Sequence, residues 1–192
     1  MMALLALSLS GGAWAAALGL PESTARIGYA AGVSRLTVDD PAGPAETAIN
    51  AQPLTLIYTD LLSGKLRYWV EGYYFPTTLD ASTTDIGQDI SRIGAQLALQ
   101  RNVQWRQWSP WLGLGIDVSR NSFTHRHTAD SDGFLLNSYA DRSATAFGIS
   151  AHLVNEWALT RDWDISAKLG QVFAVSGGMN ETSLSVGVLY RY

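Results

Sequence analysis

One stretch of the chain carries the three residue types of an acyl-transfer triad. Ser150, His152 and Glu156 lie at even spacing on the polar side of the alternating sequence 144–159. Serine, histidine and a carboxylate can together hydrolyse an ester. Residues two apart on one strand have Cα atoms about 6.5–7 Å apart, however, which is a poor distance for a Ser–His hydrogen bond. A buried polar network around His152 and Glu156 is the better interpretation, and a hydrolase is the alternative.

A second group of chemically capable residues lies in the polar segment 121–143. It contains His125, His127, Asp130 and Asp132, and histidine and carboxylates are ligands for transition metals. Their spacing matches no fixed ligand geometry. An ordinary polar loop is therefore expected, with metal binding as the alternative, and no cofactor is predicted.

The composition restricts the fold that could position such residues. The 192 residues are 47% hydrophobic but only 16% charged, whereas soluble domains carry roughly 25% charged residues. After the first twenty residues, no apolar run reaches the ~18 residues of a membrane helix. There is no cysteine, which excludes disulfides, thiolate metal sites and a cysteine nucleophile. The net charge of −4, without a basic patch, argues against nucleic acid as a partner.

The N-terminus has the pattern of a secretory signal peptide. Residues 3–10 read ALLALSLS, and the small-x-small sequence Ala13-Trp14-Ala15 follows shortly after. This pattern predicts a signal peptide over residues 1–15, with cleavage as late as residue 17. The remainder, 16–192, is then one β-barrel domain.

From Ala25 onward, polar and apolar residues alternate with a period of two, which indicates β-strands. The expected strands are about 10–16 residues long, near the ~9–11 residues that a tilted membrane strand requires. Short joins at 61–64, 104–107 and 160–162 alternate with long polar joins at 39–50, 77–89 and 121–143, and the last join, 177–181, is brief. The predicted strands are 25–38, 51–60, 65–76, 90–103, 108–120, 144–159, 163–176 and 182–192.

Alternation alone does not decide which face points inward, and a soluble lipocalin-like barrel would place the apolar face inside. The polar faces are rich in Gly, Ala and Ser, which suits the narrow interior of an eight-stranded barrel. Their charges also nearly balance, as buried charges must. We therefore predict a transmembrane antiparallel up-and-down barrel with a polar interior. The predicted interior network consists of Arg26, Arg67, Glu71, Arg92, Asp117, His152, Glu156, Asp164, Lys168 and Arg191.

Aromatic residues on the apolar face gather where membrane interfaces are expected, since Trp and Tyr prefer the headgroup zone. Near the long-loop end, Tyr74 stands with Phe147 and Phe173. At the short-turn end, the set is Tyr58, Tyr68, Trp108, Trp157, Trp163, Tyr190 and Tyr192.

The chain ends in LSVGVLYRY, residues 184–192, with alternating apolar positions and an aromatic last residue. This ending resembles the C-terminal signal by which bacterial outer-membrane proteins are recognised for assembly. The architecture as a whole resembles the small OmpA/OmpX/OmpW-like eight-stranded barrels of Gram-negative bacteria. The resemblance implies integral outer-membrane localisation, with short turns in the periplasm and long loops outside. It also implies outer-membrane lipid, lipopolysaccharide and the barrel-assembly machinery as partners, and another envelope protein as a further one.

The predicted outer loops are acidic. Their carboxylates outnumber Arg120, Arg126 and Arg142. A structural or interaction role is therefore expected for a barrel whose interior is plugged by side chains such as Trp69 and Trp111. The alternatives are a small channel for ions or apolar solutes and a lipid A-modifying hydrolase, an activity that some small barrels have. The acidic residues assigned to these loops are Asp39, Asp40, Glu46, Asp80, Asp85, Asp89, Asp130, Asp132, Asp141 and Glu181.

Overall fold

The computed structural model describes residues 24–38, 46–176 and 179–192, without the side chains of 50–53. The predicted signal peptide lies outside the described residues. Asp39 and Asp40 of the predicted outer loops also lie outside them. Within the described part, no helix is long and apolar enough to cross a membrane.

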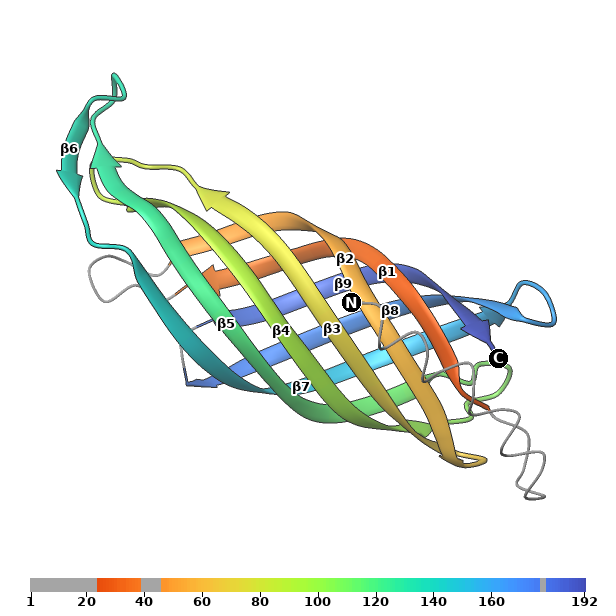
Figure 1. Cartoon of the computed structure of the whole chain (residues 1–192). Coiled ribbons are helices and arrows are strands. Elements are labelled where there is room, and N and C mark those ends of the chain that lie inside the picture. Colours follow the sequence, from red (N-terminus) through yellow and green to blue (C-terminus); the bar gives the residue numbers. More distant parts are fainter. Residues whose placement is uncertain (1–23, 39–45, 177–178) are drawn as a thin grey trace.

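Eight antiparallel strands close into a barrel (Figure 1). Each strand pairs with its neighbours in chain order, and the ring is closed by pairing of β1 with β9 and of β4 with β5. A ninth strand, β6 (Leu135–Ser138), lies outside the ring and pairs with the outer end of β5. The strands of the ring are β1 (Arg26–Val38), β2 (Glu46–Ser63), β3 (Leu66–Leu79), β4 (Gly87–Asn102), β5 (Trp111–Ala129), β7 (Arg142–Ala158), β8 (Trp163–Ser176) and β9 (Met179–Arg191).

The strands reach further outward than the sequence predicts. The segment 121–143, predicted as one long loop, is strand as far as Ala129 and forms the β5–β6 hairpin beyond it. Phe123 pairs with Ile90 on one side and with Arg142 on the other, so the ladder continues above the predicted end at residue 120. The prediction was wrong here because outward-facing residues such as Ser122 are polar, which removes the polar–apolar contrast that marks a strand.

The start of β5 is also displaced. The sequence predicts a strand from Trp108, but Trp105 and Trp108 form an isolated bridge in a tight turn, with reciprocal backbone hydrogen bonds of 2.8 and 3.0 Å. Arg106 inside this turn has a φ of 57°, in the left-handed region. The turn keeps the join between β4 and β5 compact.

The two faces of the wall differ as a transmembrane barrel with a polar interior requires. Along β3, Arg67, Trp69 and Glu71 are buried in the interior, whereas Leu66 and Tyr74 face outward. On β5 the outward Leu114 is 70% exposed and the inward Asp117 is 2% exposed. Apolar side chains therefore cover the outside of the barrel, and charged side chains lie in its lumen.

Candidate functional site

The lumen near the short turns holds a cluster of paired charges. Arg26 and Arg191 stand directly opposite each other across the β1–β9 pair. Asp164 of β8 lies between them, 2.6 Å from Nη2 of Arg191 and 3.4 Å from Nε of Arg26. Glu156 of β7 accepts a hydrogen bond from Arg26 at 2.6 Å and forms an ion pair with Arg67, whose Nη1 lies 2.7 Å from its Oε1. Each carboxylate thus serves two arginines, which offsets the cost of burying these charges.

Arg67 links this cluster to the centre of the lumen. Its guanidinium lies over the ring of Trp111, 4.0 Å from the centroid, and 5.0 Å from that of Trp69. Its Nε donates to Gln100, whose amide nitrogen is 2.6 Å from Nε2 of His152. The planar cation is therefore stacked and hydrogen-bonded, which suits arginine better than lysine.

A second pair occupies the middle of the lumen. Lys168 of β8 contacts the Glu71 carboxylate across the barrel and donates to Gln96 at 3.2 Å. The indole Nε1 of Trp69 donates to the same carboxylate at 2.7 Å. The cavity beside them is about 20 Å³, enough for about one water molecule. Side chains from opposite sides of the barrel thus meet in the middle of the lumen.

The outer half of the lumen is organised around Arg92. Its guanidinium is 2.9 Å from Asp117 and 2.6 Å from Glu181. Tyr73 donates its hydroxyl to Asp117 at 2.6 Å, and Ser34 donates to Glu181 at 2.8 Å. The two carboxylates of this group thus each have a cation and a hydroxyl as partners inside the wall.

Glu181 corrects the sequence analysis, which assigned it to an outer loop. It lies on β9, which begins at Met179, and it is 5% exposed because it shares the inward face with Ser183 and Ser185. That shared parity is the signal that could have placed it. When Glu181 is added to the predicted network, its five cations are matched in number by five carboxylates.

Above Arg92 the lumen contains a cluster of buried apolar side chains, which the sequence analysis did not predict. Phe75 and Phe123 are each 1% exposed there, and the guanidinium of Arg142 lies 4.1 Å from the Phe123 ring centroid. The predicted interior network therefore does not include this apolar end of the lumen. The cluster, called the apolar cap below, consists of Leu36, Val38, Ala48, Tyr73, Phe75, Leu79, Ile90, Phe123 and Met179.

The structure does not assemble the triad. Ser150 and His152 are buried in the lumen, and Glu156 is engaged by two arginines. Among the described residues, neither the Ser150 hydroxyl nor Nδ1 of His152 has a hydrogen-bond partner. The geometry that a Ser–His–carboxylate hydrolase needs is not present in this arrangement.

The four candidate metal ligands are also kept apart. His125 pairs with Asp89 at 2.8 Å, and Nδ1 of His127 is 2.7 Å from the carbonyl oxygen of His125. Asp130 accepts the backbone N–H groups of Asp132 and Phe134. In the described part of the chain, no three His, Cys, Asp or Glu side chains come together as a metal site.

Asp89 lies beyond the apolar outer band, at the outer end of β4. Hydrogen bonds from His125 and from the Thr78 hydroxyl (3.0 Å) hold the pKa of this carboxyl below its ordinary value. Two other residues of the predicted acidic surface are also engaged by their neighbours. Glu46 lies on β2 and accepts the Ile86 N–H at 3.1 Å, and Asp141 accepts the His125 N–H at 3.1 Å.

The predicted interface aromatics lie on the outward face. At the short-turn end, the rings of Trp163 and Tyr190 are 5.0 Å apart, and Tyr68 donates to the Tyr58 hydroxyl at 3.2 Å. Trp105, which the sequence analysis omitted, is 67% exposed in the same region. Outward-facing or half-exposed positions are found for Tyr58, Tyr68, Tyr74, Trp108, Trp157, Trp163, Tyr190 and Tyr192.

An apolar outer wall, aromatic side chains at one rim and a charge-paired interior define a membrane-spanning β-barrel. No protein-family model matches the chain, and no curated protein matches it. Solved structures do resemble it.

Three of these solved structures are outer-membrane or surface proteins of Gram-negative bacteria. Neisserial surface protein A is 16% identical, with a TM-score of 0.59, and the match covers 88% of this chain and 98% of that one. OprG from Pseudomonas aeruginosa is 13% identical, with a TM-score of 0.57, covering 88% and 97%. Ail, the attachment invasion locus protein of Yersinia pestis, is 10% identical, with a TM-score of 0.52, covering 87% and 98%. The predicted fold, and with it the predicted place in the bacterial outer membrane, agree with these neighbours.

Proposed function

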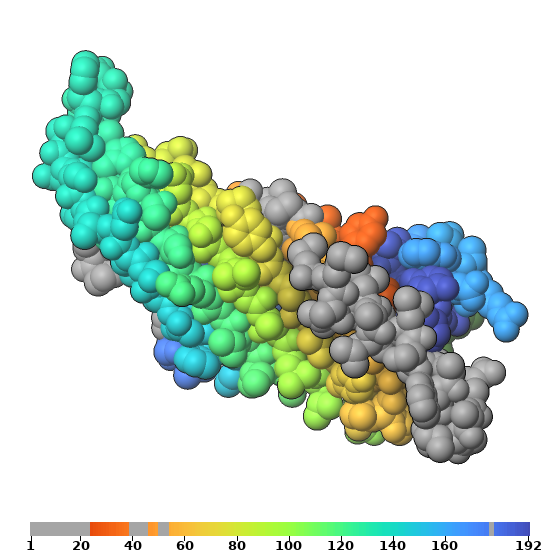
Figure 2. All heavy atoms as spheres, in the orientation of Figure 1, coloured from red at the N-terminus to blue at the C-terminus, as the bar shows by residue number. Residues whose placement is uncertain are grey.

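We propose that this protein is a closed outer-membrane barrel that binds another protein through the hairpin formed by the end of β5 and β6. The observation that carries the proposal is the tip of this hairpin. Phe134, Leu135 and Leu136 are 70%, 64% and 50% exposed there. Figures 1 and 2 show the hairpin extending well past the rest of the barrel wall. Adjacent large apolar side chains at an exposed tip are the usual mark of an interaction site.

The hairpin has a built turn that holds these side chains in place. Gly133, with a φ of 85°, donates its N–H to the Asp130 carbonyl at 3.1 Å. Asp130 in turn donates its own N–H to the Phe134 carbonyl at 3.0 Å, and its carboxylate accepts two further N–H groups. A preordered turn lowers the entropy that binding costs. The turn therefore favours presentation of the apolar tip to a partner.

A hollow of about 530 Å³ lies beside the hairpin. Its lining combines Leu135 with polar groups from His125, Tyr139 and Asp141. Apolar contact surrounded by polar groups is the ordinary composition of a protein–protein interface. The proposed partner is thus a protein with an apolar patch, belonging either to the envelope or to a surface that the bacterium meets.

The interior supports a non-conducting barrel over the channel alternative. A water path would have to pass both the apolar cap and the paired charges around Arg92 and Glu71, in an eight-stranded barrel that leaves little free space. In planar lipid bilayers the protein should therefore give no reproducible unit conductance steps. Regular steps would refute the closed lumen, while leaving the hairpin proposal to its own test.

Photo-crosslinking in the native envelope tests the interaction. A photoreactive phenylalanine analogue at Phe134 or Leu135 should give a discrete adduct with one protein after irradiation. The same analogue at Phe147, which is 52% exposed on the lipid-facing wall, is the matched control and should not give that adduct. Identical adduct patterns from both positions, or none from the hairpin, would contradict the proposal.

A further inference from the structure

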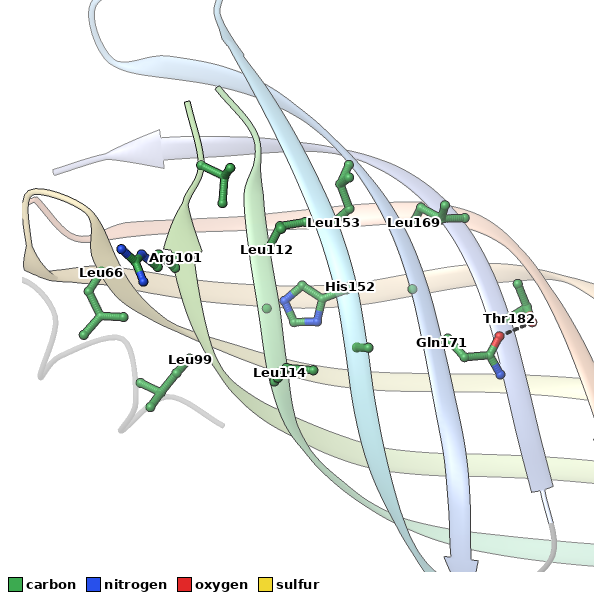
Figure 3. Close-up of a pocket in the computed structure, with 14 residues that line it drawn as sticks. Leu66, Leu99, Arg101, Leu112, Leu114, His152, Leu153, Leu169, Gln171 and Thr182 are labelled. Atoms are coloured by element: carbon green, nitrogen blue, oxygen red, sulfur yellow. Dashed lines mark hydrogen bonds between the residues drawn. The ribbon is translucent and has the colours of Figure 1, made fainter. Parts of the chain in front are cut away.

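A groove of about 930 Å³ crosses the outer wall within the apolar band (Figure 3). It runs over β3, β4, β5, β7, β8 and β9, and its lining is dominated by side chains that face away from the lumen. Leu99, Leu112, Leu114 and Leu169 are 46–70% exposed along it. The groove therefore opens towards whatever surrounds the barrel.

The strand register explains the groove. Arg101, Leu112 and Leu153 lie in one row of paired residues across β4, β5 and β7. The floor between this row and the next contains Gly113 and Gly170, and the next row has the small residue Ala151 beside Leu114. Because strands in a closed barrel are tilted, a row of paired residues climbs obliquely around the wall. The groove thus rises from the short-turn rim into the apolar band.

Positive charge marks the lower end of the groove. Arg101 is exposed and lines the groove, and among the described residues it has no ion-pair or hydrogen-bond partner for its guanidinium. Lys65 is exposed in the adjacent turn, where its carbonyl accepts the Asn102 N–H at 2.9 Å. Two cations beside an apolar groove at a membrane interface match a phosphate-bearing headgroup with its acyl chain.

We propose that the groove binds one anionic phospholipid of the leaflet at the short-turn rim. An acyl chain lies between the leucine rows over Ala151, and the phosphate is held by Arg101 with Lys65. The occupant must come from the bilayer, because the groove opens on the apolar outer wall. The site rests on the barrel fold alone and is independent of the hairpin and its partner.

Native mass spectrometry of the full chain in detergent tests the site. The probes are phosphatidylglycerol and phosphatidylcholine with identical acyl chains. A single phosphatidylglycerol should bind, with an affinity about 25-fold above that of phosphatidylcholine, because each of the two basic residues contributes about fivefold near anionic lipid. Arg101→Gln should reduce that preference to about fivefold, and Ala151→Phe, which fills the groove, should weaken both lipids. Excess glycerol 3-phosphate should not displace the bound lipid.

Matched controls separate a site from general attraction. Arg161→Gln removes an exposed cation from another short turn, and Ala31→Phe enlarges an outward residue on β1, away from the groove. Both should bind both lipids as the unchanged protein does. Equal losses in Arg101→Gln and Arg161→Gln would overturn the headgroup site, and unchanged binding in Ala151→Phe would overturn the chain site. Displacement by glycerol 3-phosphate would reduce the site to one for free phosphate. Heat-modifiable gel migration confirms that each variant is folded.

Discussion

Arg92→Ala should be among the most destabilising single substitutions in this barrel. The guanidinium is 1% exposed and is the shared partner of Asp117 and Glu181, whose side chains are 2% and 6% exposed. Its loss leaves two carboxylates inside the wall without their cation, and it also removes the contact over the Tyr73 ring at 5.2 Å. Breaking a buried pair costs about 3–5 kcal/mol. The adjoining cavity admits about one water, too little to solvate both carboxylates, so we expect a loss in that range.

Reversible urea unfolding in detergent micelles, followed by tryptophan fluorescence, measures this loss. Arg35→Ala is the matched control, because Arg35 is an exposed arginine on the outward face of β1, and it should change stability by less than about 0.5 kcal/mol. The triple variant Arg92→Met, Asp117→Asn, Glu181→Gln should recover at least half of the loss, since no charge is then left without a partner. A free energy of unfolding for Arg92→Ala within about 1 kcal/mol of the Arg35→Ala value would refute the reasoning.

Three further substitutions test other parts of the structure. A Cβ on Gly113 would lie 2.2 Å from Nε2 of His152, so Gly113→Ala should lower the free energy of unfolding by about 1–3 kcal/mol. The loss should be smaller in a His152→Ala background, and equal losses in both backgrounds would exclude this contact. A double-mutant cycle on Trp163 and Tyr190, whose rings are 5.0 Å apart, should give a coupling of about 0.5–1.5 kcal/mol in urea unfolding, and additive effects would show that the rings do not interact. His125→Ala should raise the pKa of Asp89 towards its ordinary value in a carboxyl ¹³C NMR titration, because the hydrogen bond that favours the charged form is lost; an unchanged titration would show that the pair does not form in solution.

The sequence predicts the barrel because polar–apolar alternation marks each strand wherever one of its faces is apolar. Where neither face has that contrast, the strand ends were predicted wrongly. Above Ser119, the outward residues of β5 become polar, and the strand that continues to Ala129 could not be distinguished from a loop. Tertiary pairing with β4 and β7, which no local pattern records, maintains it there.

The interior could be predicted by composition but not by pairing. Inward parity identifies Arg67, Glu71 and Lys168 as lumen residues, yet the partner of each depends on strand stagger, which the sequence does not contain. Glu181 was misplaced because its strand was predicted to begin at residue 182. The apolar cap was missed for a related reason. Phe123 lies beyond the predicted strand end, and it is apolar and inward while its outward neighbours Ser122 and Thr124 are polar, so the two faces exchange character along β5.

The two arginines that face each other at the β1–β9 closure constrain how the ring can shut. Like charges directly opposite on adjacent strands repel, and here Arg26 and Arg191 are compatible because Asp164 on the next strand lies between them. A slip of one residue at this closure would turn Arg191 to the lipid side and leave Asp164 with less compensation inside. The pairing of the first and last strands of the chain therefore favours one register, because any one-residue shift would leave charged side chains without their partners.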